Sequence, residues 1–483
     1  MDLSPERIRN LLTRLPRYTL PTIHITGTNG KGSVSSFVAS ILQTSGFTVG
    51  RFNSPHLVSV LDSIVINGDP ISPDLYKDAR RMVEDIDWEF GIGATSFELL
   101  TATALMLFES AKPDVIIIEV GMGGLTDATN AIYDDCILVS ALTSVDLDHQ
   151  KFLGETVGEI ATQKAGIARK GRPFVIGPQK HPEVLDSVRT VIEKIGADLV
   201  YADAAILRPA VVDGPSEPVT STSPLPFHAT LRPISLFLPC FPDPIDAQLP
   251  LHGDHQLDNL GVAGGIISSL LNHPSGIHRL PFQSKITPST IAAGVRSTSW
   301  KGRLSFHDVP LSRLRRPGVG TDALEETLTV LVDGAHNPAS ASALASYMSR
   351  LFESANSGDL KLVFLLALSH SPPKTPMQTL SPLLSFKRPT NVRISVSAAA
   401  LEFTPVEGMP WVQPVPSEEI RKVIREIDGD INLWIPKDGE RTSVVNALLW
   451  AHEERKVHRG NGLVCVAGSL YVVADFYRDC FGS

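Results

Sequence analysis

The feature that most constrains the fold of this chain is the glycine-rich segment Gly27–Ser33, which lies between an extended run and an amphipathic run. The β-branched run Thr22–Thr26 before it is typical of a short strand. Apolar residues from Val34 to Leu42 then recur at helical spacing, and Gly46 marks a helix end. Glycines let successive N–H groups face one phosphate, and the helix N-terminus adds partial positive charge. The sequence therefore predicts a phosphate-binding loop, with an ordinary glycine-rich turn as the alternative.

The side chains of this loop suit a nucleotide that binds together with Mg²⁺. Lys31 can reach the β- and γ-phosphates, and the hydroxyl of Ser33 can ligate the metal. Compared with the common GxxxxGK[ST] pattern, the first glycine lies closer to Lys31, and Gly32 separates Lys31 from Ser33. This spacing indicates a subset of phosphate-loop enzymes, but it does not separate a ligase from a kinase, a GTPase or a motor. The predicted nucleotide-binding residues of the loop are Gly27, Thr28, Asn29, Gly30, Lys31, Gly32 and Ser33.

Short β-branched runs alternate with helical patterns in both halves of the chain, which predicts an α/β fold with mostly parallel sheets. Because 483 residues exceed what one hydrophobic core usually supports, we expect two domains. Residues 1–298 are predicted to form a mononucleotide-binding domain, and residues 299–483 a smaller Rossmann-like domain. The predicted strands are 115–120, 137–142, 328–332, 362–368 and 463–467, and the predicted helices are 97–108, 155–168, 344–352, 418–427 and 444–452.

The segment 202–250 differs in composition from its surroundings, because proline and serine are dense and helical periodicity disappears. We interpret it as irregular loops and short β-hairpins at the edge of a domain. A flexible linker is the alternative, although the run 234–238 favours some strand.

The composition is typical of a folded cytoplasmic protein. A net charge of −9 argues against broad binding to nucleic acid or anionic membranes, so we expect neither as a partner. Cys136 and Cys465 lie in apolar runs, which predicts buried thiols and a reducing compartment. The segment 1–10 has no apolar secretory core, and no apolar run is long enough to span a bilayer. A mitochondrial pool remains compatible with this interpretation.

A series of short motifs resembles the dihydrofolate synthase/folylpolyglutamate synthase family of the Mur ligase superfamily. Each motif is weak alone, but together they extend from residue 24 to residue 471 in the order of the family. The matching segments are HITGTNGKGS (24–33), NSPHL (53–57), TSFE (95–98), EVGMGG (119–124), DATN (127–130), LDH (147–149), KAGI (164–167), GDHQ (253–256), WKGRL (300–304), DGAHNP (333–338) and GSLY (468–471).

The resemblance implies a ligase that joins L-glutamate to dihydropteroate or to a reduced folate, with ATP and Mg²⁺ as cofactors. A carboxylate is a poor electrophile, so ATP first converts it to an acyl phosphate, and the amine of glutamate then displaces phosphate. Such phosphoryl transfer needs charge neutralisation and in-line positioning more than covalent help from side chains. The first domain would then be the ATP-binding central domain, and the second the glutamate-ligase domain.

The metal-binding and catalytic residues are also implied by the matching motifs. In the wider family the lysine of the KAGI motif is carbamylated, which converts a cation into an anion that supports metal binding. For Lys164 the alternative is a surface lysine on its helix. For His56, expected near the metal or the pterin, the alternative is an ordinary turn histidine. The implied metal ligands are Ser33, Ser54, Glu119, His149 and carbamylated Lys164, and the implied catalytic residues are Lys31, His149, Lys164 and His336.

Further residues resemble those that hold ATP from its far side. Asn259 would contact the adenine, while Arg303 and Asp333 would reach phosphate and ribose from the second domain. The alternatives are an interdomain salt bridge for Arg303, and helix capping for Asp333 and His336, since Asn337 and a proline begin a helix. A site completed by both domains would exclude water from the acyl phosphate.

Two segments depart from the family pattern. Where the family commonly has Gly-Gly-Arg-Leu-Asp, this chain has Leu125 and Thr126 in place of the arginine and leucine. The lysine-aspartate stretch expected after the strand at 362–368 is replaced in the segment 369–374. The first departure is the only support for a pseudoenzyme that binds ATP without making an amide. A simple ATPase is a third hypothesis, but it leaves the NSPH and GDHQ motifs unexplained.

The acceptor is predicted from three segments. Asn29, the run 50–52 and the run 61–67 resemble fungal dihydrofolate synthases, whereas polyglutamylating enzymes commonly have lysine at the first position and Glu-Arg in the last run. We therefore expect dihydropteroate as acceptor, with folylpolyglutamate synthase or a bifunctional enzyme as the alternatives. The resemblance also implies a monomer.

Overall fold

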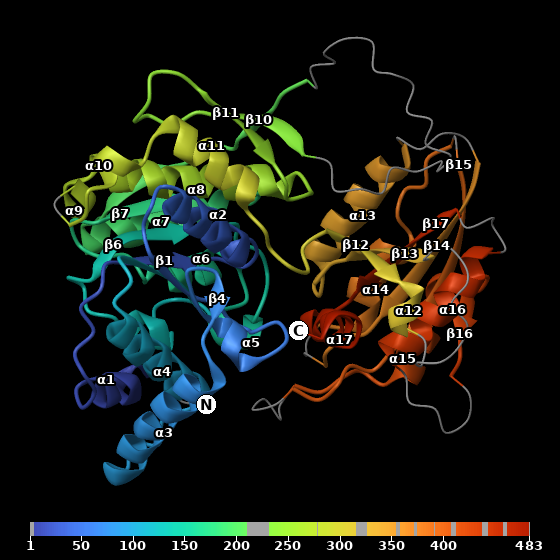
Figure 1. Cartoon of the computed structure of the whole chain (residues 1–483), viewed down its shortest axis with the longest axis horizontal. Coiled ribbons are helices and arrows are strands. Elements are labelled where there is room, and N and C mark those ends of the chain that lie inside the picture. Colours follow the sequence, from blue (N-terminus) through green and yellow to red (C-terminus); the bar gives the residue numbers. More distant parts are fainter. Residues whose placement is uncertain are drawn as a thin grey trace. The chain divides into compact units, whose positions relative to one another are not determined.

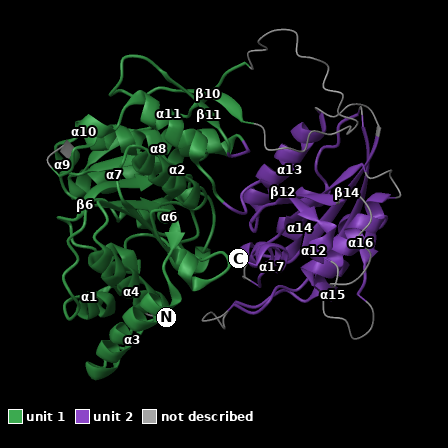
Figure 2. Cartoon of the chain, viewed as in Figure 1, with its two compact units in different colours: residues 1–210, 231–250, 254–300 green, residues 211–230, 251–253, 301–483 purple. Residues whose placement is uncertain are grey.

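The computed structural model (Figure 1) describes residues 4–209, 231–277, 279–314, 326–353, 358–370, 374–390, 392–406, 412–436, 443–456 and 461–482. The chain divides into two compact units, which Figure 2 distinguishes by colour. Unit 1 comprises residues 1–210, 231–250 and 254–300, and unit 2 comprises residues 211–230, 251–253 and 301–483. Each unit contains a mostly parallel sheet with helices packed against it, so the predicted α/β class is confirmed.

The main sheet of unit 1 has eight strands in the order β4-β3-β2-β5-β1-β6-β7-β8. The six strands from β2 to β8 along this order are parallel, and β3 and β4 add an antiparallel edge. Strands β1, β5, β6 and β7 are buried throughout, which explains their continuous apolar sequences. The strands are β1 (Thr22–Thr26), β2 (Val49–Phe52), β3 (Ile64–Ile66), β4 (Asp69–Pro70), β5 (Val115–Glu119), β6 (Ile137–Leu142), β7 (Pro173–Ile176) and β8 (Asp198–Tyr201).

Helices cover both faces of this sheet. Figure 1 shows α2, α8 and α11 on one face and α4 with α1 and α3 on the other. Phe52, Ile116 and Ile118 of the sheet pack with Phe108 of α4 in one apolar cluster. The helices of unit 1 are α1 (Glu6–Leu12), α2 (Lys31–Thr44), α3 (Pro73–Glu89), α4 (Ser96–Ala111), α5 (Gln150–Leu153), α6 (Val157–Ala165), α7 (Pro182–Ile195), α8 (His255–Asn272), α9 (Pro274–Ile277), α10 (Phe282–Lys285) and α11 (Pro288–Ser297), with 3-10 turns at Val60–Ser63 and Ala128–Ala131.

The proline- and serine-rich segment contains a small antiparallel sheet in the order β11-β10-β9. Its strands are β9 (Ile206–Leu207), β10 (Arg232–Leu236) and β11 (Ile245–Leu249), so the predicted strand at 234–238 overlaps β10. Residues 210–230 of this segment lie outside the described residues. The hairpin interpretation is confirmed for the part that is described.

The sheet of unit 2 has six strands in the order β12-β13-β17-β14-β15-β16, parallel except for β12 at one edge. Its apolar core contains residues of α13, α14 and α15 packed on β14, β15 and β17. This arrangement confirms the Rossmann-like class. The strands are β12 (Ser305–Pro310), β13 (Thr327–Val332), β14 (Gly358–Leu366), β15 (Val392–Ala400), β16 (Asn432–Trp434) and β17 (Gly462–Ala467), and the helices are α12 (Leu311–Leu314), α13 (Pro338–Glu353), α14 (Pro376–Leu384), α15 (Ser417–Ile427), α16 (Val444–Lys456) and α17 (Leu470–Phe481).

All the predicted strands and helices are present; β1 and β6 have the predicted ends, and the others differ at one or both ends. The largest change is in the helix predicted at 344–352, which is α13 (Pro338–Glu353), while the helix predicted at 155–168 is the shorter α6 (Val157–Ala165). Helix α6 begins later than predicted because the side chain of Thr156 accepts a hydrogen bond from the amide of Glu159, which fixes Thr156 as the N-cap. Cys136 and Cys465 are buried free thiols, as predicted.

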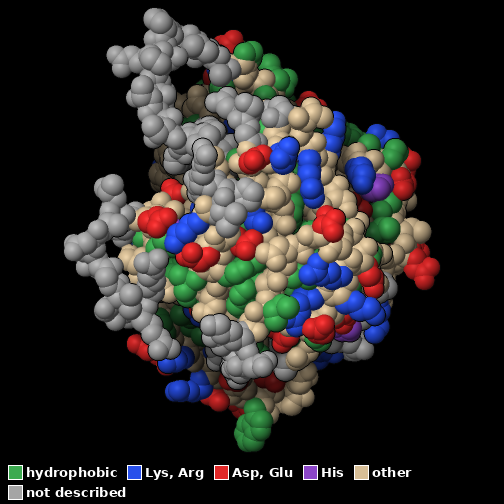
Figure 3. All heavy atoms as spheres, turned by 90° about the vertical axis from the view of Figure 1, so that its right-hand side faces the viewer, with side chains coloured by type: hydrophobic (Ala, Val, Ile, Leu, Met, Phe, Trp, Pro, Cys, Tyr) green, Lys and Arg blue, Asp and Glu red, His purple; other side chains and the backbone are tan. Residues whose placement is uncertain are grey.

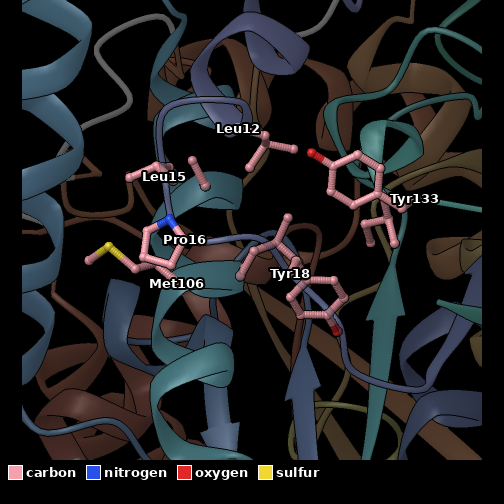
Figure 4. Close-up of a pocket in the computed structure, with 9 residues that line it drawn as sticks. Leu12, Leu15, Pro16, Tyr18, Met106 and Tyr133 are labelled. Atoms are coloured by element: carbon pink, nitrogen blue, oxygen red, sulfur yellow. The ribbon is translucent and has the colours of Figure 1, made fainter. Parts of the chain in front are cut away.

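The surface and the cavities add little to the search for a site. On the face drawn in Figure 3, basic and acidic side chains are interspersed. Within the described residues, no helix combines the length and apolar character needed to cross a membrane. A small apolar cavity in unit 1 (Figure 4) is lined by residues that include Leu12, Leu15, Pro16, Tyr18, Met106 and Tyr133. None of the predicted site residues lines it.

Candidate active site

The predicted phosphate loop connects β1 to α2, as expected. Gly30 is the N-cap of α2 with φ 93°, a conformation that favours glycine, and no side chain caps the helix there. The amides of Thr28 and Asn29 donate to the carbonyl oxygen of Ser144, at 2.8 and 3.4 Å. The loop is thus fixed against the segment after β6, while the first turn of α2 keeps its uncapped N–H groups for an anion.

Two amide side chains of α8 support the loop. Nε2 of Gln256 donates to Oγ of Ser33 at 3.3 Å, and Nδ2 of Asn259 donates to Oε1 of Gln256 at 3.0 Å. Oδ1 of Asn259 lies against Gly30, where an added Cβ would be only 2.2 Å away. The structure therefore places Asn259 beside the loop. Gln256 was not predicted as a site residue, although its spacing of three from Asn259 puts both on one helix face.

The unusual glycine between Lys31 and Ser33 has a structural reason. A Cβ on Gly32 would lie 2.5 Å from Cζ2 of Trp300, so the indole packs directly on the first turn of α2. Any larger residue at this position would displace the ring. The spacing that separates this loop from the common pattern thus follows from a contact within unit 1.

A buried carboxylate stands beside the loop. Glu119 ends β5, next to β1 in the sheet, and its Oε2 accepts a hydrogen bond from Nδ2 of Asn53 at 2.7 Å. Its Oε1 lies 3.7 Å from Nζ of Lys31. Nζ of Lys31 also donates to the carbonyl oxygens of Gly27 and Thr28, at 3.1 and 3.3 Å. Lys31 is therefore folded back on its own loop.

These groups fit a magnesium ion better than a transition metal. In the described part of the chain, no three His, Cys, Asp or Glu side chains gather as ligands. The predicted set supplies oxygen atoms from Ser33, Ser54 and Glu119, and Mg²⁺ prefers oxygen ligands together with phosphates and water. Oγ of Ser54 is buried and has no hydrogen-bond partner among the described residues, so it is available to a cation.

Lys164 is a buried residue of the site, and the alternative of a surface lysine is wrong. Its side chain comes from the last turn of α6, and the residue is 4% exposed. Nζ donates to the carbonyl oxygen of Gly27 at 2.9 Å, the same oxygen that Lys31 contacts. Burial, and next the neighbouring Lys31 cation, lower the pKa of Lys164 to about 7. An amine with this pKa is partly neutral at physiological pH, which is the form that reacts with carbon dioxide.

The two predicted histidines of unit 1 differ in exposure. His149 is the N-cap residue of α5 with φ 51°, and its side chain is 49% exposed. Asp148 lies near enough to Lys164 to raise the pKa of its ammonium. His56 is buried in the segment that carries Asn53 and Ser54. His149 directly follows Asp148, the residue whose charge acts on Lys164.

In unit 2, Arg303 lies just before β12, and Asp333 and His336 lie just after the neighbouring strand β13. Oδ2 of Asp333 accepts from the amide of Leu304 at 2.8 Å, and Oδ1 accepts from the amide of Ala335 at 2.9 Å. Burial raises the pKa of Asp333, and the Arg303 guanidinium opposes this shift. Leu304 is buried with φ 47°, so Asp333 stabilises a strained turn directly after Arg303.

Helix capping does not explain Asp333. The amide of Ser340 donates to Oδ1 of Asn337 at 2.9 Å, and the amide of Asn337 donates to Oγ of Ser340 at 3.1 Å, so these two residues cap α13. The amide of His336 also donates to Oγ of Ser340, and its Nδ1 lies 2.8 Å from the carbonyl oxygen of Gly334. His336 is thus fixed at the start of α13. It takes part in capping through its backbone amide, not through its imidazole.

Of the two departures from the family pattern, only the first lies wholly within the described residues. Leu125, at the place of the usual arginine, is 48% exposed, and its carbonyl accepts a hydrogen bond from Nδ2 of Asn130 at 3.0 Å. The loop therefore keeps its fold without the arginine. In the segment 369–374, the amide of His370 donates to the carbonyl oxygen of Gln413, while residues 371–373 lie outside the described residues.

A glycine-rich loop after the first parallel strand, with a buried lysine and glutamate beside it, defines a nucleotide-binding enzyme of the phosphate-loop class. Comparisons with known proteins specify the family. The chain is 31% identical over 481 residues to dihydrofolate synthetase of Saccharomyces cerevisiae. The match covers 99% of this chain and 98% of the yeast protein. The chain is 29% identical over 480 residues to the probable dihydrofolate synthetase of Schizosaccharomyces pombe, with coverage of 99% and 98%.

A family model and a solved structure agree with this result. Residues 320–479 match the model of the dihydrofolate synthetase C-terminal domain. The structure of Mycobacterium tuberculosis folylpolyglutamate synthase complexed with ADP and AMPPCP matches with a TM-score of 0.73 at 25% identity, over 99% of this chain and 96% of that chain. The chain therefore belongs to the dihydrofolate synthase/folylpolyglutamate synthase family.

Proposed function

We propose that this protein is an ATP-dependent ligase that joins L-glutamate to dihydropteroate and releases dihydrofolate, ADP and phosphate. The observation that carries the proposal is the convergence of Lys31 and Lys164 on the carbonyl oxygen of Gly27. A protein that only binds ATP has no need of a second buried lysine at its phosphate loop. A ligase has this need, because a carbamylated Lys164 would hold a second metal ion beside the phosphate that is transferred.

The residues of unit 1 divide the work of phosphoryl transfer. The amides of the loop and Lys31 would hold the phosphates of ATP, and Asn259 would contact the adenine. Ser33, Ser54 and Glu119 would hold Mg²⁺, with Lys164 and His149 at the second metal site. When bound, these ions neutralise charge on the phosphates. The carboxylate of the acceptor then attacks the γ-phosphorus, ADP leaves, and the amine of glutamate displaces phosphate from the acyl phosphate.

Unit 2 also carries proposed nucleotide ligands. Arg303 and Asp333 would reach phosphate and ribose, and His336 would lie next to them. The hydrogen bonds of Asp333 to the turn after Arg303 support a role in positioning the guanidinium. We propose residues 1–298 as the ATP-binding domain and residues 299–483 as the glutamate-ligase domain.

Dihydropteroate is the proposed acceptor because both yeast relatives are named dihydrofolate synthetases and match nearly the whole chain. Folylpolyglutamate synthase activity is the second candidate, since the mycobacterial structural relative is named for it. One chain with both activities is compatible with either comparison. We further propose a monomer of the cytoplasm, without nucleic-acid or membrane partners; the net charge of −9 supports the absence of these two partners.

Incorporation of radiolabelled glutamate tests the proposal. The assay contains ATP and Mg²⁺ and is run in parallel with dihydropteroate and with tetrahydrofolate. Incorporation with dihydropteroate alone is the expected result. Incorporation with tetrahydrofolate alone would move the assignment to folylpolyglutamate synthase, and incorporation with both would indicate a bifunctional enzyme. Absence of incorporation with either acceptor, in protein that binds ATP, would refute a folate ligase.

A further inference from the structure

Arg51 is a cation that the site described so far does not use. It lies on β2 between Gly50 and Phe52, and Phe52 belongs to the apolar cluster under α4. Because side chains alternate along a strand, Arg51 points to the other face of the sheet. Glu119 points to that same face, since Ile118 before it belongs to the same cluster as Phe52.

The side chain of Arg51 is partly buried, and the charge that acts on it is that of Glu119. Its Nε is buried and has no hydrogen-bond partner among the described residues. Burial lowers the pKa of Arg51 to about 10, and the charge of Glu119 opposes this shift, so the group stays protonated at neutral pH. A partly buried guanidinium whose Nε has no hydrogen-bond partner can bind a ligand anion with little further desolvation.

Two contacts place this cation beside the phosphate loop. Cζ of Arg51 lies 4.9 Å from the centre of the Trp300 ring, which also packs against Gly32. Glu119, whose charge acts on Arg51, lies 3.7 Å from Nζ of Lys31. Arg51 is therefore next to the first turn of α2, on the side of the loop lysine.

We propose that Arg51 binds the terminal phosphate of ATP, the one that is transferred to the acceptor. This assignment rests on the proposed function. Lys31 and Arg51 both act on Glu119, a proposed Mg²⁺ ligand, and the metal-bound end of the nucleotide is its terminal phosphate. A planar guanidinium offers two parallel N–H groups to two phosphate oxygens, and stacking on an indole holds it in one plane. The acceptor carboxylate is the competing ligand.

Isothermal titration of the full-length protein with two nucleotides tests the proposal. The probes are AMPPNP, which carries a γ-phosphate joined through nitrogen, and ADP, which ends at its β-phosphate. Each is added with Mg²⁺. Arg51→Met keeps the length of the side chain and removes its charge. We expect it to weaken AMPPNP binding about 10- to 100-fold, as for the loss of a charged hydrogen bond, and ADP binding by less than about threefold.

A second variant and a control make the result specific. Arg51→Lys keeps the charge and loses the planar fork, so AMPPNP binding should weaken by about three- to tenfold, between the wild type and Arg51→Met. Arg14→Met is the matched control, because the Arg14 guanidinium lies 4.4 Å from the Phe90 ring in the same unit. Both affinities should be unchanged in this control.

Three results would overturn the assignment. They are equal weakening of both nucleotides, no weakening of either, and unchanged AMPPNP binding with a raised KM for dihydropteroate, which would indicate the carboxylate. If Arg51→Met does not fold, an unchanged ratio of the two affinities in Arg51→Lys overturns it as well. A wild-type protein that binds neither nucleotide would instead refute the proposed function and Arg51 with it. Ligation by the wild type, with full AMPPNP affinity in Arg51→Met, would refute Arg51 alone.

Discussion

Replacing Gly32 with alanine perturbs the packing of Trp300 on the phosphate loop. The new Cβ would lie 2.5 Å from Cζ2 and 2.9 Å from Cε2 of a rigid ring, so the indole or the helix must move. Gly32 does not have a positive φ, so backbone strain does not contribute. Overpacking of this kind costs about 1–3 kcal/mol, and the higher helix propensity of alanine offsets at most about 1 kcal/mol. We therefore expect the free energy of unfolding to fall by about 1–2 kcal/mol.

Thermal unfolding measures this loss, which corresponds to a Tm lower by about 2–5 °C. Gly158→Ala in α6 is the matched control, because its Cβ would meet only Oγ of Ser187, at 3.0 Å. Its stability should be unchanged or slightly higher. In a Trp300→Leu background, Gly32→Ala should cost nothing, because the ring is absent. Full stability of Gly32→Ala, or a loss that persists without the ring, would refute the reasoning.

Three further predictions concern single side chains. Asp333→Ala should lower the free energy of unfolding by about 2–4 kcal/mol in urea, because the amides of Leu304 and Ala335 lose their acceptor; a loss below about 1 kcal/mol would contradict this. Burial lowers the pKa of His307 to about 4, so the unfolded chain binds more protons than the folded one between this pH and about 6.5. Stability should therefore decrease by up to about 3 kcal/mol as the pH falls through that range, and His307→Phe should flatten the slope; an equal slope in both proteins would be evidence against this. Lys164→Ala should lower kcat for ligation at least about 100-fold in the glutamate assay while ADP affinity changes less than about threefold, and unaltered ligation would exclude its catalytic role.

The loop and its flanking elements could be predicted because their signals are local. Each strand and helix pattern near Gly27–Ser33 needs only adjacent residues, and β1 and α2 appear where the pattern places them. The start of α6 depends on a hydrogen bond to one side chain, that of Thr156, so the helix predicted at 155–168 began too early.

Helix α8 could not be predicted from periodicity. Most of its residues are buried, so apolar side chains occur on every side and no amphipathic pattern arises. Its glycines also argue against a helix by propensity. The structure explains Gly261, because a Cβ there would lie 2.1 Å from the carbonyl oxygen of Asp203. Close packing therefore overrides the local preference.

The motifs predicted the residues of the candidate site. They did not predict the neighbouring side chains that contact those residues. Gln256 contacts Ser33, and Trp300 contacts Gly32 and Arg51, across long separations in sequence. Such pairs depend on which strands and helices become neighbours, and one sequence has no local signal for that. The buried state of Lys164 also follows from the sheet order rather than from its helix.

The carbonyl oxygen of Gly27 joins ligand binding to the stability of unit 1. The amines of Lys31 and Lys164 meet at this one oxygen, and the charge of Lys31 is one of the causes that lower the pKa of Lys164. Their mutual repulsion makes the empty folded state less stable, and an anion bound between them removes that repulsion. Because the anion binds only the folded protein, its binding stabilises the folded state. Sulfate or phosphate ions should therefore protect the protein against heat before any substrate is added.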